Sequence, residues 1–360
     1  MSNISAKRKK FNLLQVFRGL AAVLIILVHC DLIYNQNYNQ DFWFKIFNFG
    51  GSGVDFFFVL SGFLIFYLHQ KDIGNKDKVF SFLRKRITRI YPIYWVVLTL
   101  KISASWILSY NSDVSQRSSL EIIQAFLLFP QDRTILSSSF LGVSWTLSFE
   151  VFFYIIFGIL MAISTRWSFL IIAAWILGTL ANFTGLIDLS QSDLLIQFVF
   201  NEHNLEFVLG CLAAFTVSKY KGSGNQGMAL LCVGIFLYTL SAINMNYKIV
   251  EISRIIGYGI PSLLMVIGST YLETYKNIKV PNVLTYIGDA SYSIYLMHGF
   301  AINNITKLIF KFSPESTQNI FFINFTGIFI ALIALAFGCL IYTCIEKPLI
   351  YIVKPKLAKA

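Results

Sequence analysis

The chain has 360 residues, of which 56% are hydrophobic and 13% are charged, and its mean hydropathy is +0.66. Soluble domains carry about 25% charged residues, so this composition excludes a soluble enzyme, a secreted disulfide scaffold and a disordered chain. The net charge of +11 does not indicate a nucleic-acid partner, because the Lys and Arg residues stand in short clusters between apolar runs. We therefore predict an integral protein of the lipid bilayer.

Ten mostly apolar stretches predict about ten transmembrane helices in one all-α bundle, which we expect to occupy residues 1–360 with no appended soluble domain. Their predicted bounds are 12–34, 51–70, 91–109, 143–163, 167–187, 204–218, 226–243, 255–272, 285–306 and 321–345. Two shorter apolar pieces, 122–130 and 193–204, are expected to lie against the membrane or the bundle. The five cysteines show no zinc-type or redox-type spacing, and the sequence predicts no metal site.

The loops alternate in charge along the chain. Of the 29 Lys and Arg residues, 20 lie in loops that this alternation assigns to one side, 7 lie in loops on the other side, and two lie inside predicted spans. Basic loops stay on the cytoplasmic side of a membrane. We therefore expect both termini and the Arg84–Arg89 cluster inside, and the loops around Asn39, Asp113 and Ser316 outside.

The first predicted span holds two ionisable residues, Arg18 and His29, and each such residue costs about 2.5 to 3.5 kcal/mol in a membrane, so each is a candidate for function. They are eleven residues apart, which is about 16 Å and three turns of a helix. Both side chains are therefore expected on one face, Arg18 near the cytoplasmic end and His29 towards the outer end. Two structural alternatives remain open: Arg18 snorkels to the inner headgroups, or His29 only bonds a neighbouring helix.

Two further ionisable residues are expected at the depth of His29. Glu150 lies about seven residues, or roughly 10 Å, below the outer end of the fourth span, and His298 lies in the outer half of the ninth span. An imidazole beside a carboxylate is suited to general-base catalysis, because the carboxylate orients the ring and stabilises its charged form. His298 has a structural alternative, a hydrogen bond to a neighbouring helix.

Two polar features flank the second span. Asp55 lies near its outer end, where it either caps the helix N-terminus or lines a substrate pocket. After its inner end comes the basic segment FLRKRITRIYP, in which Arg86 and Arg89 share a helix face. This segment is either an ordinary cytoplasmic anchor or a cradle for phosphates, because guanidinium groups bind phosphates in a fork.

Six motifs then follow one another in a fixed order. They are RGLAAVLIILVH from Arg18, GSGVDFFFVLSGFLI from Gly51, RKRITRIYP from Arg84, WTLSFEVFFY from Trp145, YSIYLMH from Tyr292 and IEKP from Ile345. With these motifs the sequence resembles the acyltransferase-3 family of integral membrane acyltransferases over essentially its whole length. The resemblance implies transfer of an acyl group, usually acetyl from cytoplasmic acetyl-CoA, to a carbohydrate hydroxyl at the outer side of the membrane.

The resemblance also implies roles for single residues. His29 matches the essential histidine of the family, and Arg18, Arg86 and Arg89 match arginines associated with acyl-CoA. Glu150 matches the glutamate of a Ser-x-x-x-Glu motif. The serine position of that motif holds Thr146, which keeps a hydroxyl group.

The function we expect is therefore an O-acetyltransferase of the bacterial inner membrane that uses acetyl-CoA and modifies a cell-surface polysaccharide or its lipid-linked precursor. His29 and Glu150 would be catalytic, and Asp55, Thr146 and His298 would contact substrate. Some relatives carry an extra hydrolase-like domain, and we expect any such acceptor domain to be a separate extracytoplasmic protein. The alternative is a secondary transporter of a glycolipid or an anionic solute, although the two halves of the sequence show no symmetry.

Overall fold

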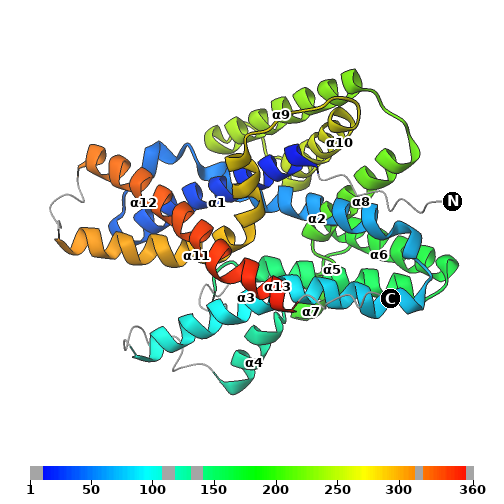
Figure 1. Ribbon diagram of the computed structural model, residues 1–360, viewed down its shortest axis with the longest axis horizontal. Helices are drawn as coiled ribbons and strands as arrows, with labels where there is room; N and C mark the ends of the chain where they lie inside the picture. The colour runs from blue at the N-terminus through cyan, green and yellow to red at the C-terminus, as the bar shows by residue number, and fades with distance from the viewer. Residues whose placement is uncertain (1–10, 108–117, 131–140, 313–318, 354–360) are drawn as a thin grey trace.

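The computed structural model describes residues 11–107, 118–130, 141–312 and 319–353, and every regular element in these ranges is a helix (Figure 1). The α-helices are α1 (Asn12–Tyr38), α2 (Gly53–His69), α3 (Val79–Ile107), α4 (Ser119–Leu127), α5 (Ser144–Ala162), α6 (Thr165–Phe183), α7 (Leu194–Val199), α8 (His203–Lys219), α9 (Gly224–Tyr247), α10 (Ile260–Tyr275), α11 (Asn282–Phe312), α12 (Ile320–Ile341) and α13 (Lys347–Val353). Short 3₁₀ turns join α1 to α2 and α2 to α3, and π-helical turns precede α10 and follow α12. The prediction of an all-α membrane bundle is confirmed.

Seven helical stretches in the described ranges are long and apolar enough to cross a membrane, so the chain is a multi-pass membrane protein. They are Asn12–Tyr38, Asn48–Asp72, Ser144–Ala162, Thr165–Phe183, Gly224–Tyr247, Ile255–Tyr275 and Ile320–Val353. Helices α3, α8 and α11, which the sequence also predicts to cross, pack among them. The count of ten crossings stays a prediction, and the loops around Asp113 and Ser316, as well as the basic ends of the chain, lie outside the described residues.

The two short apolar pieces form α4 and α7, of 9 and 6 residues, which are too short to cross a bilayer. Helix α4 is attached to α3 by three side chains. Tyr91, Tyr94 and Trp95 donate hydrogen bonds to the backbone carbonyls of Leu127, Ala125 and Phe126. The three carbonyls lie in the last turn of α4, where backbone acceptors outnumber helical donors. Ala125 also accepts from the Leu128 backbone N–H at 3.1 Å, and the bonds from α3 add to this capping.

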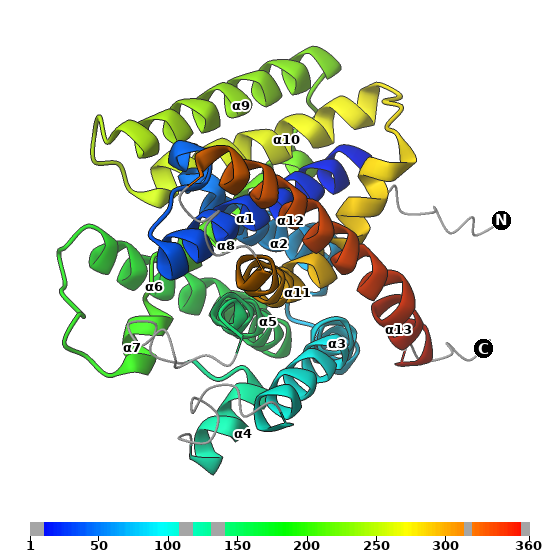
Figure 2. The same ribbon diagram turned by 90° about the vertical axis from the view of Figure 1, so that its left-hand side faces the viewer.

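Four helix pairs share the most extensive contacts, namely α9 with α10, α2 with α8, α1 with α11, and α11 with α12. The α2 and α8 backbones approach closely because glycines face each other: a Cβ on Gly62 would lie 2.1 Å from the carbonyl oxygen of Phe207, and one on Gly210 would lie 2.0 Å from that of Val59. Small residues allow such approaches in membrane bundles. Figure 2 shows α9 and α10 on one side of the central helices and α3 and α4 on the other.

Candidate active site

Between α1, α2, α3, α5 and α11 lies a pocket whose space, counted together with the open solvent at its mouth, is about 790 Å³. Its polar wall combines residues that lie far apart in the sequence. Arginines come from α1 and α3, a carboxylate comes from α5, and hydroxyl groups come from α2, α5 and α11. The polar lining residues are Arg18, Ser61, Arg86, Arg89, Thr146, Glu150, Tyr154, Ser291, Tyr292 and Tyr295.

Three of these side chains are the arginines that the sequence singled out. Arg18 donates to Gln15 Oε1 and to Ser291 Oγ of α11, both at 3.0 Å. Helix α3 begins at Val79 and not near residue 91, because the polar residues before Tyr91 continue the helix outside the apolar segment. Arg86 and Arg89 therefore lie on one helix, and both line the pocket.

Aromatic rings hold the guanidinium group of Arg86. Its central carbon lies 5.7 Å from the ring centroid of Phe82 and 5.8 Å from that of Tyr154. Its Nε is buried and has no hydrogen-bond partner among the described residues. The ring contacts favour a fixed orientation of the guanidinium group, and the unpaired donor is suited to an anionic ligand.

Glu150 is the carboxylate of this pocket. Its Oε1 accepts hydrogen bonds from Ser61 Oγ of α2, at 3.2 Å, and from the hydroxyl group of Tyr154 one turn further along α5. Three guanidinium groups and one carboxylate, when ionised, give the wall an excess of two positive charges. The pocket is therefore electrostatically suited to a ligand with several negative charges.

Thr146 lies one turn before Glu150 on α5 and also lines the pocket. Its Oγ1 donates to the Val143 carbonyl at 2.9 Å and shares a hydrogen bond of 2.9 Å with the hydroxyl group of Tyr295 on α11. A serine at this position would keep the same oxygen. Thr146 thus ties the first turn of α5 to α11 in the pocket wall.

His29 and His298 lie together, with 4.6 Å between their ring centroids and an angle of 72° between the ring planes. His29 Nδ1 bonds the carbonyl of Ile25 at 2.8 Å, and His298 Nδ1 bonds that of Ile294 at 3.3 Å. Because a carbonyl oxygen can only accept, both bonds place a proton on Nδ1 and leave Nε2 with a lone pair. His298 is only 1% exposed, and its Nε2 has no hydrogen-bond partner within the described part of the chain.

The shared face of Arg18 and His29 is confirmed, since Arg18 contacts Ser291 and His29 contacts His298, both on α11. The expected pairing of His29 with Glu150 is not present in the described structure. The carboxylate bonds Ser61 and Tyr154, whereas the histidine contacts α11. Equal depth in a membrane does not bring two side chains together, because the rotation of each helix decides which neighbour it faces.

Asp55 lies in the first turn of α2, where a negative charge is expected near a helix N-terminus. It does not line this pocket, and no hydrogen bond joins it to a backbone N–H among the described residues. Its carboxylate instead forms an ion pair with Arg254, which donates to Oδ1 from Nε at 3.1 Å and to Oδ2 from Nη2. Arg254 directly precedes the predicted span 255–272.

Several pocket residues were missed by the sequence reasoning, and helical spacing points to two of them. Tyr154 follows Glu150 by four residues and therefore shares its helix face. Tyr295 precedes His298 by three residues, and its ring centroid lies 5.8 Å from that of His298. Tyr295 lines the pocket, so one aromatic side chain links the pocket wall to the histidine pair.

A second opening adjoins the pocket and shares Arg18, Leu60 and Leu64 with it. It continues along the first turns of α1 and the last turns of α2 and α8, where Gln15, Gln70, Lys71, Asp72 and Ser218 are among its lining residues. Arg18, Leu60 and Leu64 thus stand between an opening that reaches these helix ends and the pocket lined by Thr146 and Glu150.

Comparison with known proteins gives consistent matches. A family model described as an acyltransferase domain matches residues 11–344. The exopolysaccharide production protein ExoZ of Rhizobium meliloti (strain 1021) is 27% identical over 313 residues, which cover 84% of this chain and 90% of that protein. The putative acetyltransferase ORF330 of Acidianus two-tailed virus is 24% identical over 285 residues, which cover 78% and 80% of the two chains. No solved structure matches significantly.

Proposed function

The chain belongs to the acyltransferase-3 family and is an acyltransferase. From this premise we propose that it moves an acyl group, and first of all acetyl, from cytoplasmic acyl-CoA. The acceptor would be a hydroxyl group of a cell-surface polysaccharide or its lipid-linked precursor. The observation that carries the proposal is the pocket in which Arg18, Arg86 and Arg89 meet Glu150 and Thr146. Acyl-CoA is an elongated molecule with several phosphate charges at one end and a thioester at the other.

The arginines supply the donor site in this proposal. Arg86 and Arg89 are separated by one helical turn and offer several donors to phosphate oxygens. Arg18, on α1, lines both openings. The second opening, beyond Arg18, is where we place the rest of the donor. We place the helix ends that line the second opening on the cytoplasmic side because of the charge of the loops.

His29 acts as the general base in this proposal. Its Nδ1 proton is held by the Ile25 carbonyl, so the lone pair of Nε2 is available to take the proton of the acceptor hydroxyl. The hydroxyl oxygen then attacks the thioester carbonyl carbon, the carbon–sulfur bond breaks, and CoA leaves as a thiol with the proton. His298 supports the ring of His29 from α11.

The acceptor in this proposal is a carbohydrate hydroxyl group. One relative is named for exopolysaccharide production, which favours a polysaccharide hydroxyl as the acceptor. A bilayer protein is well placed to meet either a polymer at the outer surface or a lipid-linked precursor. A separate extracytoplasmic protein that receives the acyl group is compatible with the same chemistry.

The transporter alternative has lost its support, because the chain belongs to an acyltransferase family. The direct test uses the purified protein in lipid nanodiscs with radiolabelled acetyl-CoA. We expect CoA release that rises when bacterial exopolysaccharide fragments or lipid-linked oligosaccharides are added, and label in the carbohydrate. A protein that binds acetyl-CoA but never cleaves the thioester with any of these acceptors would contradict the proposal.

A control variant separates the arginines of the pocket from the basic surface around them. Arg84 belongs to the same basic segment but is exposed and does not line the pocket. Arg84→Ala should therefore retain CoA release close to that of the unmodified protein, which shows that the basic surface alone does not explain activity.

A further inference from the structure

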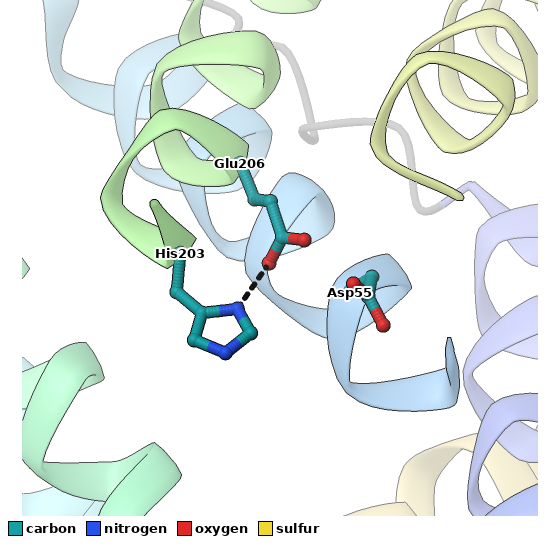
Figure 3. Close-up of side chains that lie close together, drawn as sticks. All are labelled: Asp55, His203 and Glu206. Atoms are coloured by element: carbon teal, nitrogen blue, oxygen red, sulfur yellow. Dashed lines mark hydrogen bonds and ion pairs between the residues drawn. The ribbon is translucent and has the colours of Figure 1, made fainter. Parts of the chain in front are cut away.

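Outside the pocket, a second cluster of polar side chains joins α2 to α8. Asp55 comes from the first turn of α2, and His203 and Glu206 come from the first turn of α8; one potential ligand atom from each lies within 4.8 Å of the others. The exposed fractions are 0%, 6% and 0%. Figure 3 shows the carboxylate of Glu206 between the imidazole ring and Asp55.

One atom in this cluster lacks a partner. Glu206 Oε2 lies 3.3 Å from His203 Nδ1, whereas the buried Oε1 has no hydrogen-bond partner among the described residues. The neighbouring Asp55 carboxylate has no proton to donate when it is ionised. A buried carboxylate oxygen without a donor is costly, so either a cation or a proton is needed between the two acids.

We propose that Asp55, His203 and Glu206 bind a divalent transition-metal ion of the zinc type. One imidazole nitrogen and two carboxylates are ligands that zinc accepts. A modest contraction of the cluster would bring the three ligand atoms to bonding distance of one ion. The metal would replace the proton between His203 Nδ1 and Glu206 Oε2, and binding would release that proton to water.

Arg254 fits this arrangement as a neighbour of the metal ligand. Its guanidinium group bonds Asp55, and such outer partners orient carboxylate ligands. The charges of the two carboxylates balance the charge of the metal. The positive charge of Arg254 then has no counter-charge within the cluster, but its side chain is 36% exposed and reaches solvent.

The metal would have a structural role at the edge of the active site. The ring of Phe58, which lines the pocket, lies 5.6 Å from that of His203. A metal that joins α2 to α8 would therefore fix the wall formed by the outer half of α2. The site is independent of the acyl chemistry, so its test does not depend on the proposed function.

The experiment measures metal in the purified, intact protein. After dialysis against zinc and removal of free metal, elemental analysis should find about one zinc per chain, and EDTA should lower the thermal unfolding midpoint until zinc is returned. Glu206→Gln and His203→Gln should each lose the zinc and the response to EDTA. X-ray absorption at the zinc edge should report a nitrogen and oxygen environment.

The matched control is His69→Gln. His69 Nδ1 also lies beside a carboxylate, Asp72 Oδ2 at 2.9 Å, but no third ligand residue completes that pair among the described residues. This variant should keep the zinc of the unmodified protein.

Two results would overturn the proposal. One is an unmodified protein that holds no zinc and whose unfolding midpoint does not change with EDTA or with zinc. Asp55 and Glu206 would then share a proton beside Arg254. The other is zinc binding that persists in both Glu206→Gln and His203→Gln, which would place the metal elsewhere.

Discussion

The rings of His29 and His298 meet edge to face, with 4.6 Å between their centroids, although α1 and α11 lie at opposite ends of the sequence. A second contact between the same helices, Arg18 Nη2 to Ser291 Oγ at 3.0 Å, lies towards their beginnings. The two contacts show that α1 and α11 run in the same direction. One helix pair thus holds both an arginine of the pocket and the histidine pair.

Replacing His29 should remove the chemical step. His29→Ala leaves no group to take the hydroxyl proton, and a general base contributes about 10²- to 10⁴-fold to a rate. We expect acetyl transfer to fall by that factor while acetyl-CoA binding, measured by calorimetry, stays near normal. His298→Ala should have a milder effect, because it removes only the support of the ring. Substantial transfer by well-folded His29→Ala would contradict the role. Loss of acetyl-CoA binding would instead assign His29 to the donor site.

Glu150→Gln separates two interpretations of this carboxylate. Glutamine keeps an oxygen that accepts from Ser61 and Tyr154 but removes the charge near the arginines. Because Glu150 does not bond His29 in the structure, we expect a lower rate with an unchanged pH profile of kcat/KM. A displaced profile would show that the carboxylate acts on the imidazole after all.

The sequence predicted α5 within one residue at each end, as 143–163 against Ser144–Ala162, because an apolar run there coincides with the whole helix. It predicted α3 poorly, since the helix begins at Val79 and its first turns are polar. Hydropathy marks the part of a helix that lies in hydrocarbon and does not detect a polar extension.

The residues of the pocket were predictable, but their pairing was not. Arg18, Arg86, Glu150 and Thr146 were all singled out and all line one pocket. Depth along the membrane is only one coordinate, and the order and rotation of the helices decide contacts. Glu206 was overlooked, although an ionisable residue in a predicted span is a candidate for function by the same rule that selected Glu150.

Arg86 and Arg89 should determine donor affinity. Loss of charge-assisted hydrogen bonds costs about 1 to 3 kcal/mol, so Arg86→Ala and Arg89→Ala should each weaken acetyl-CoA binding by about 5- to 150-fold. Lysine should restore only part of it, because the fork is lost. Equilibrium binding to the purified variants measures this, with Arg84→Ala as the control. Unchanged affinity in both variants would show that the basic segment around Arg86 and Arg89 is only a membrane anchor.

The orientation of the chain can be read by cysteine labelling in intact cells. In a background without the five native cysteines, an impermeant maleimide should label a cysteine at position 39 but reach one at position 219 only after the cells are opened. Asn39 and Lys219 are both exposed in the bundle, so burial does not bias the comparison. Labelling of position 219 from outside would reverse the assigned orientation.

The close approach of α2 and α8 should make Gly62 intolerant of any side chain. The added methyl group of Gly62→Ala would lie 2.1 Å from the Phe207 carbonyl oxygen, which is backbone and cannot rotate away. The helices must separate, and overpacking of this kind lowers the free energy of unfolding by about 1 to 3 kcal/mol. Gly299→Ala is the matched control, because Gly299 lies within α11 and a methyl group there meets no atom within 4 Å. Thermal unfolding in detergent should show a lower midpoint for Gly62→Ala and an equal or higher one for Gly299→Ala, since alanine favours helix. Equal midpoints for Gly62→Ala and the unmodified protein would mean that α2 and α8 are not in direct backbone contact.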